Sequence, residues 1–319
     1  MLRGYNQSTM KNQYSIFAGM TNPTMAEKDF LECAILDKLF QDKFFAENFV
    51  FAGGGSITKS YAFSPRISQD LDLAYTAFCD IPDTPSRNQL KKFRKRFKTF
   101  IFETIAPRIT SLIAADNKYQ ILTDREHCVK SNKEQWLSSP TIHILYKSAF
   151  YNRTEEIHIE IIPRKYSPSA LSFHSVMPYA LPGARFGHIP TVAYEQTFWD
   201  KVFALHSNAL SAHPHTDAFY SRHYFDVARL AGRVDLDKTA HMLSDIAQYQ
   251  EKYTTKRLGT DISPCDAILI PSDPVLYALE SDYDNLAQQT FIAPKTSWNL
   301  IVQRLEQLSQ DLKQIAYQR

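Results

Sequence analysis

Three consecutive glycines, Gly53 to Gly55, follow a short apolar run and precede Ser-Ile-Thr-Lys. The apolar run at residues 49–52 predicts a buried strand, and a short helix is expected from residue 56 to about residue 62. Glycine lets a backbone approach a ligand closely, and a helix start offers unpaired N–H groups, so this unit predicts a phosphate site. A purely structural turn is the alternative. The run is not a Walker A loop, since no Gly-Lys-[Ser/Thr] closes it. The candidate phosphate-binding residues are Gly53, Gly54, Gly55, Ser56 and Lys59.

Two aspartates, Asp70 and Asp72, lie in an alternating segment at residues 70–75 that predicts a second strand. Residues i and i+2 of a strand point to one face, with Cα atoms about 6.6 Å apart. Leu71 and Leu73 then occupy the other face. Neighbouring carboxylates on an inner strand repel each other unless a cation joins them, so the pair predicts a site for divalent ions such as Mg²⁺. Two aspartates that simply face water are the alternative.

A third acidic residue, Glu160, interrupts an apolar strand candidate at residues 157–162. A buried carboxylate without a partner is costly. A metal ion shared with the two aspartates would remove that cost, and so would an ion pair with Arg164. The residues alone leave both interpretations open.

A basic cluster lies on the long amphipathic helix predicted at residues 87–106, which Pro107 is expected to end or kink. The chain as a whole is nearly balanced, with 36 Lys and Arg against 34 Asp and Glu, so the cluster is a local excess of charge. We hypothesise that it binds an RNA backbone, with a solvated helix face as the alternative. The basic cluster comprises Arg87, Lys91, Lys92, Arg94, Lys95, Arg96 and Lys98.

The remaining patterns divide the chain into an α/β part and a helical part. A helix is expected at residues 24–46, with Thr24 as its N-cap and Glu27 closing a capping box. Prolines and glycines at residues 168–190 predict a domain boundary. Further strands are expected at residues 119–122 and 141–146, and further helices at residues 193–209, 219–231, 237–253 and 296–316.

The chain contains no apolar stretch of about 18 residues and no signal-like start, so a cytoplasmic protein without a membrane partner is expected.

Five segments carry longer motifs: residues 27–30 (EKDF), 51–59 (FAGGGSITK), 66–73 (RISQDLDL), 197–206 (TFWDKVFALH) and 222–227 (RHYFDV). In this order they resemble motifs of the AbiEii/AbiGii toxin family, which are nucleotidyltransferases of the polymerase-beta type. The family segments read EKD-aromatic, FKGGTSLSK, RFSEDIDL, TFWEKxxxLH and RHYYDL.

The departures from the family motifs are Ala52 for lysine, Gly55 for threonine and Asp200 for glutamate. The missing lysine at position 52 bears on contacts with a triphosphate.

The resemblance implies an α/β (α+β) nucleotidyltransferase domain with a mixed sheet at residues 1–188, and an all-α helical domain at residues 189–319. It implies a Mg²⁺-dependent toxin of a toxin–antitoxin or abortive-infection system, paired with a cognate antitoxin. The toxin would transfer NMP from an NTP to an acceptor, RNA at the tRNA 3′ end. The alternatives are a nucleotidyltransferase that acts on a small molecule or a protein, and a protein that binds nucleotide or RNA without catalysis.

Residue roles also follow from the resemblance. Gly54, Gly55 and Ser56 would hold the triphosphate. Asp70 and Asp72 would bind Mg²⁺ and act in catalysis, with Glu160 at the position of the third acid. Lys201 and Asp226 match the family's functional lysine and aspartate in the helical part. The structural alternatives are a solvated helix face for Lys201 and an ion pair with Arg222 or Arg229 for Asp226.

Overall fold

The chain divides into two compact units, one of residues 1–79 and 94–191 and the other of residues 80–93 and 192–319. The computed structural model describes residues 22–68, 70–77, 81–113, 119–122 (as backbone), 140–151, 153–179, 181, 183–253, 258–290 and 295–315. Among these residues, no helix combines the length and apolar character that crossing a membrane requires.

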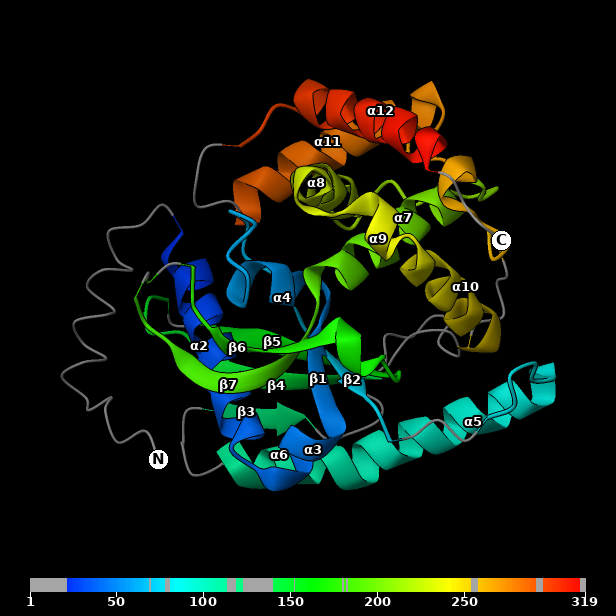
Figure 1. Cartoon of the computed structure of the whole chain (residues 1–319). Coiled ribbons are helices and arrows are strands. Elements are labelled where there is room, and N and C mark those ends of the chain that lie inside the picture. The colour runs from blue at the N-terminus through cyan, green and yellow to red at the C-terminus, as the bar shows by residue number, and fades with distance from the viewer. Residues whose placement is uncertain are drawn as a thin grey trace. The chain divides into compact units, whose positions relative to one another are not determined.

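The first unit is built on a seven-stranded mixed sheet with the order β3-β4-β5-β2-β1-β7-β6 (Figure 1). The pair β1–β2 is antiparallel, whereas β2–β5 and β1–β7 are parallel, which confirms the expected mixed sheet. The pairs β3–β4 and β4–β5 are antiparallel. The strands are β1 (Phe49–Ala52), β2 (Asp70–Tyr75), β3 (Tyr119–Leu122), β4 (Thr141–Lys147), β5 (Thr154–Pro163), β6 (Leu171–Val176) and β7 (Phe186–Val192).

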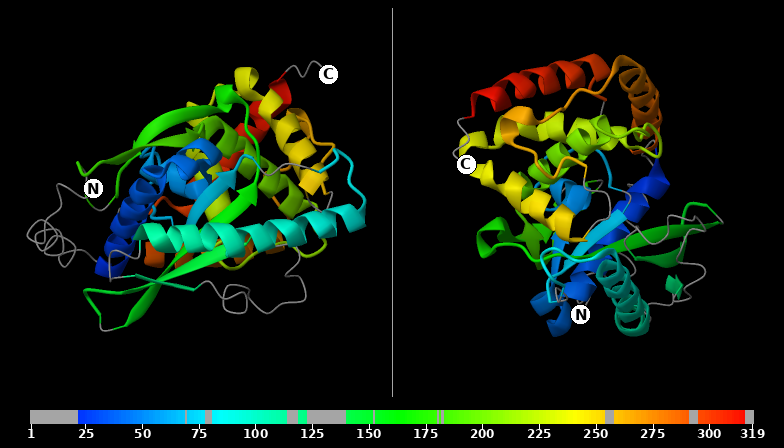
Figure 2. Two further views of the ribbon diagram at one scale, coloured as in Figure 1. Left: turned by 90° about the horizontal axis from the view of Figure 1, so that it is seen from below. Right: turned by 90° about the vertical axis from the view of Figure 1, so that its right-hand side faces the viewer.

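Strands β2, β4 and β5 bury alternate side chains, as their sequence patterns predict. Leu71 and Leu73 of β2 are fully buried, as are Ile157, Ile159 and Ile161 of β5. Helices cover the sheet on both sides, with α4 (Gly53–Lys59) opposite α3 (Lys43–Asn48) and α6 (Ala106–Ile113) (Figures 1 and 2). On β2, β4 and β5 the buried leucines and isoleucines form the core face and partly exposed, more polar residues occupy the other, whereas every residue of β1 is buried.

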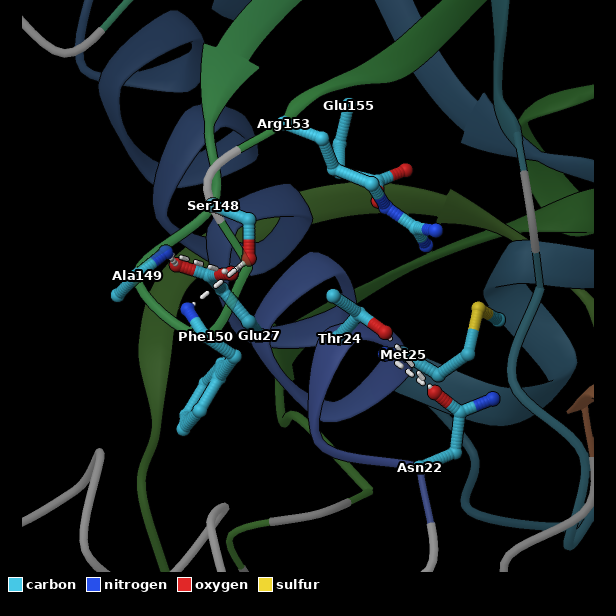
Figure 3. Close-up of polar contacts among 9 residues, drawn as sticks. All are labelled: Asn22, Thr24, Met25, Glu27, Ser148, Ala149, Phe150, Arg153 and Glu155. Carbon is cyan, nitrogen blue, oxygen red and sulfur yellow. Dashed lines mark hydrogen bonds and ion pairs between the residues drawn. The ribbon is translucent and has the colours of Figure 1, made fainter.

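The helix expected at residues 24–46 is two helices, α2 (Pro23–Phe40) and α3. A new helix begins after Asp42, because the Asp42 carboxylate accepts from the backbone N–H groups of Phe44 and Phe45 and thereby caps the N-terminus of α3. The capping box predicted at Thr24 is wrong. Asn22 is the N-cap of α2, and its Oδ1 accepts from Met25 N at 3.2 Å and from the Thr24 hydroxyl at 3.1 Å (Figure 3).

The basic helix α5 (Arg87–Phe100) continues through a π-helical turn, Ile101–Ile105, into α6. Pro107 therefore does not end the helix. It closely follows the π-helical turn, which interrupts the regular i→i−4 hydrogen bonding that a proline would otherwise break. Leu90, Phe93 and Phe97 are buried, as the amphipathic pattern predicts.

The second unit is helical, as expected. Its helix α7 packs on α8 and α10, and α8 packs on α11 and α12. The sequence pattern did not predict α11, and it predicted α9 and α10 as a single helix. The helices are α7 (Tyr194–Ala209), α8 (Ser221–Leu230), α9 (Leu236–Thr239), α10 (His241–Tyr253), α11 (Asp273–Thr290) and α12 (Trp298–Gln314).

Removal of the α3 cap is expected to destabilise the first unit. Asp42 also forms a two-point contact with Arg108, Oδ1 to Nε at 3.0 Å and Oδ2 to Nη2 at 2.8 Å. Asp42→Ala should lower the free energy of unfolding by about 1–2 kcal/mol, and Arg108→Ala, which leaves the cap in place, by less than about 1 kcal/mol. Urea unfolding measures both, and equal losses would contradict the role of the cap.

The hydrogen bond from Arg108 lowers the pKa of Asp42 below its ordinary value. The contribution of Asp42 to stability is therefore complete above its unfolded pKa, about 4, and is lost as the pH falls through its lower folded pKa. The difference in stability between wild type and Asp42→Ala should accordingly shrink in strongly acidic urea titrations.

Candidate active site

Three carboxylates gather on the polar face of two neighbouring strands. In the parallel register of β2 and β5, Asp72 is paired with Glu160 and Asp70 with His158. Paired residues on adjacent strands lie about 4.8 Å apart and point to the same face. Asp70, Asp72 and Glu160 are all partly exposed, in contrast to the buried residues between them. The three side chains thus share one face, and their carboxylate oxygens are the ligand type that a hard divalent cation such as Mg²⁺ prefers.

Gly53 brings the backbone of α4 against one of these carboxylates. It has a φ of +66°, and a Cβ placed on it would lie 1.8 Å from Oδ2 of Asp72. A side chain at this position is excluded both by the backbone conformation and by the carboxylate. At Gly55 a Cβ would lie 3.0 Å from the ring of Phe51, which is also tight. Gly53 therefore serves the close packing of the α4 backbone against Asp72, and Gly55 its close packing against Phe51.

The glycines do not precede the helix, as the sequence analysis expected, but form its first turn, since α4 begins at Gly53. Ala52 at the N-cap position provides no side-chain hydrogen bond. Ser56 is buried, and its hydroxyl donates to the Gly53 carbonyl at 2.8 Å. The Ser56 hydroxyl thus stabilises the turn, and a contact of this hydroxyl with phosphate would require that bond to break.

Lys59 is not at the site surface, which corrects its prediction as a phosphate-binding cation. Its side chain is 0% exposed and forms ion pairs with Asp29 and, at 2.8 Å, with Glu32 of α2. Burial lowers the pKa of Lys59, but the two carboxylates outweigh it and raise the pKa above its ordinary value. Burial is also the main reason why the pKa of Glu32 is raised. Lys59 therefore acts as an internal cation that joins α4 to α2.

Glu27, which the sequence placed in a capping box, instead holds the turn between β4 and β5. Its Oε2 accepts from the Ser148 hydroxyl at 2.7 Å, and its Oε1 accepts from Ala149 N at 3.1 Å (Figure 3). The Ser148 hydroxyl oxygen in turn accepts from Phe150 N at 3.1 Å. The turn that returns the chain to β5 is thereby attached to α2.

Sequence reasoning missed His158, which contacts the carboxylate group. Its Nδ1 lies 3.2 Å from Oδ1 of Asp70, and its Nε2 lies 2.9 Å from Oε2 of Glu156. The hydrogen bond with Asp70 raises the pKa of His158 despite the opposing effect of burial. The signal was present in the sequence, because His158 stands two residues before Glu160 and therefore on the same face of the strand.

In the second unit, Lys201 and Asp226 are partners. Lys201 Nζ lies 2.9 Å from Asp226 Oδ2 and 3.4 Å from Nδ1 of His223. The side chain of Asp226 is 0% exposed and that of Lys201 is 8% exposed. This contradicts the solvated-face alternative for Lys201, and the ion pair joins α7 to α8.

The basic cluster of α5 has an exposed face, as the pattern predicts. Arg87, Lys91, Lys92, Lys95 and Arg96 are exposed, whereas Arg94 and Lys98 are half-buried.

Substitution of Gly53 should disrupt the site. Gly53→Ala is expected to lower the free energy of unfolding of the first unit by about 3 kcal/mol, because alanine is strained at this φ and meets the Asp72 carboxylate. Gly232→Ala is the control, since a Cβ there meets nothing within 4 Å, and it should change stability by less than about 0.5 kcal/mol. Equal urea midpoints for the two variants would contradict the proposed packing.

The internal role of Lys59 predicts a large structural cost for its removal. Lys59→Met leaves Asp29 and Glu32 buried without their cation and should destabilise the first unit by about 3–5 kcal/mol. Lys43→Met removes only an exposed pair with Glu47 and should cost less than about 0.5 kcal/mol. A Lys59→Met variant as stable as Lys43→Met in calorimetry would restore Lys59 as a candidate phosphate ligand.

Comparison with known proteins identifies the family to which the chain belongs and a solved structure with a similar fold. A family model described as "Nucleotidyl transferase AbiEii toxin, Type IV TA system" matches residues 34–313. The structure is similar to MenT4, a nucleotidyltransferase toxin of Mycobacterium tuberculosis, with a TM-score of 0.55, 15% identity, and coverage of 98% of this chain and 91% of MenT4. JHP933 of Helicobacter pylori has a TM-score of 0.45 and 15% identity, with coverage of 90% and 91%. No curated protein matches the chain.

Proposed function

Because the chain belongs to the AbiEii family of nucleotidyl transferase toxins of type IV toxin–antitoxin systems, we propose that it transfers NMP from an NTP to the 3′ end of a tRNA. The chain is thus a nucleotidyltransferase, and its family implies an NTP substrate and a cognate antitoxin. The observation that supports the proposal most is the pairing of Asp72 with Glu160 beside Asp70.

The carboxylates of Asp70, Asp72 and Glu160 would hold divalent ions, Mg²⁺ in this proposal. Their shared face and oxygen chemistry fit such an ion. When bound, Mg²⁺ activates the attacking hydroxyl and neutralises charge on the phosphates. The acceptor oxygen forms a bond to the α-phosphorus, and the bond between the α-phosphorus and the bridging oxygen breaks, so pyrophosphate leaves.

The chain's other residues would bind and orient the NTP. The first turn of α4, Gly53 to Gly55, would lie along the triphosphate, because the N–H groups in the first turn of a helix have no partner within the helix and favour an anion. Lys201 and Asp226 match the family's functional lysine and aspartate, and the proposal gives them a role in function; within the second unit Asp226 holds the Lys201 ammonium in an ion pair. The basic cluster of α5 would bind the phosphate backbone of the acceptor RNA.

A transfer assay tests the reaction. The full chain is incubated with total tRNA, Mg²⁺ and each α-³²P-labelled NTP in turn. We expect label on tRNA, reduced at least ~100-fold in Asp70→Asn/Asp72→Asn, because the remaining site cannot hold the metal. Asp237→Asn, an exposed aspartate of α9, should retain full activity.

The outcomes of this assay separate the alternatives. Label on protein or on a small molecule instead of tRNA would change the acceptor. Thermal stabilisation by NTP and Mg²⁺ without any transfer would indicate a binding protein without catalysis. Neither stabilisation nor transfer would contradict the proposed site.

The role of the basic cluster predicts a change in salt dependence. Lys92→Glu/Lys95→Glu should weaken tRNA binding and reduce the slope of log Kobs against log salt by about 0.7–0.9 for each phosphate group that the variant no longer neutralises. Lys313→Glu, an exposed position on α12, is the control. An unchanged slope in the double variant would place the RNA elsewhere.

A further inference from the structure

Two histidines and a glutamate form a second group of metal-ligating side chains on the polar face of the sheet. His143 of β4 is directly opposite His158 of β5, and Glu156 is two residues before His158 on the same strand. Their candidate ligand atoms all lie within 4.8 Å of one another. None of the three belongs to the motifs that suggested the nucleotidyltransferase family.

Both imidazole rings direct a nitrogen to one carboxylate oxygen. Nδ1 of His143 lies 3.1 Å from Oε2 of Glu156, and Nε2 of His158 lies 2.9 Å from the same atom. A tetrahedral zinc ion, bound to nitrogen and oxygen at about 2.0–2.2 Å, has ligand atoms about 3.3 Å apart. The distances at Glu156 are already close to this value, so small side-chain rotations would complete the site.

The orientation of His158 fits that of a metal ligand. Its Nδ1 faces Oδ1 of Asp70 at 3.2 Å, which leaves Nε2 directed to Glu156 and His143. Metal-bound histidines characteristically donate their other ring N–H to a carboxylate, which sets the tautomer and the ring orientation. Asp70 is placed to perform this function for His158.

The donor set distinguishes this group from the three carboxylates. Two imidazole nitrogens and one carboxylate oxygen suit Zn²⁺ and related transition metals, whereas Mg²⁺ prefers oxygen ligands. Side-chain exposures of 14% for His143, 30% for His158 and 46% for Glu156 leave the group accessible to an ion from solvent.

We propose that His143, Glu156 and His158 bind a transition-metal ion of the Zn²⁺ class, at a site that has none of Asp70, Asp72 and Glu160 as a ligand and in which Asp70 only orients His158. The ion joins β4 to β5 and holds His158 against Asp70. The proposal stands on these side chains and does not require that the chain transfers nucleotides.

Calorimetric titration of the metal-free, full-length protein with Zn²⁺ tests the proposal. Excess Mg²⁺ is present throughout to occupy the carboxylate site. We expect one equivalent of Zn²⁺ to bind, with an affinity at least ~10-fold lower in His143→Ala and in Glu156→Gln. Asp70→Ala should weaken binding by ~10–100-fold through the orientation of His158.

The exposed His-x-His pair elsewhere in the chain provides the matched control. His213→Ala/His215→Ala should bind Zn²⁺ as the wild type does, since these residues lie in the second unit. Circular dichroism checks the fold of each variant, and His143→Asn replaces His143→Ala if that protein is unfolded. No saturable binding, displacement of Zn²⁺ by Mg²⁺, or an affinity unchanged in the His143 and Glu156 variants would overturn the proposal.

Discussion

The buried ion cluster of Lys59, Asp29 and Glu32 determines where the short helix α4 lies. It connects the end of α4 to α2, and Asp29 also accepts from the backbone of Tyr179. Burying three charges is costly, and mutual attraction compensates only when the geometry is correct. A displacement of α4 would separate these charges and would also move Gly53 away from Asp72. The position of the proposed nucleotide site thus depends on a contact at the opposite end of the same helix.

The strands of the sheet could be predicted because burial on one face leaves an alternating pattern. Residues 70–75 were predicted with the bounds that the structure has for β2. Strand β7 was missed because it contains Gly187 and Pro190, and β6 was missed because Pro168 and Pro178 flank it, so that the whole segment resembles a linker. Helix α11 was missed because acids and tyrosines weaken its apolar stripe. The first residues of helices were also difficult to predict, since only the backbone geometry shows that Asn22 is the N-cap of α2 and that α4 begins at Gly53.

The candidate site was predictable in residue type but not in arrangement. Three acids on two strands were visible in the sequence, yet only the strand register shows that Asp72 is beside Glu160. Lys59 was predicted to bind phosphate because the sequence alone does not distinguish an exposed lysine from one that is buried between two acidic residues. Asp226 was given two arginines as possible partners, whereas its partner in the structure is Lys201, 25 positions earlier in the sequence.

The contact between Gly53 and Asp72 has a consequence at the level of the gene. Glycine is encoded by GGN codons, and every single-base change that alters the amino acid gives a residue with a Cβ or a stop codon. Each such residue would place a carbon 1.8 Å from the Asp72 carboxylate. Every point mutation at this codon that changes the amino acid therefore introduces a steric clash or ends the chain. If toxicity is selected against, mutations at this codon offer a route to loss of function, because every amino-acid change there damages the packing of Gly53 against Asp72.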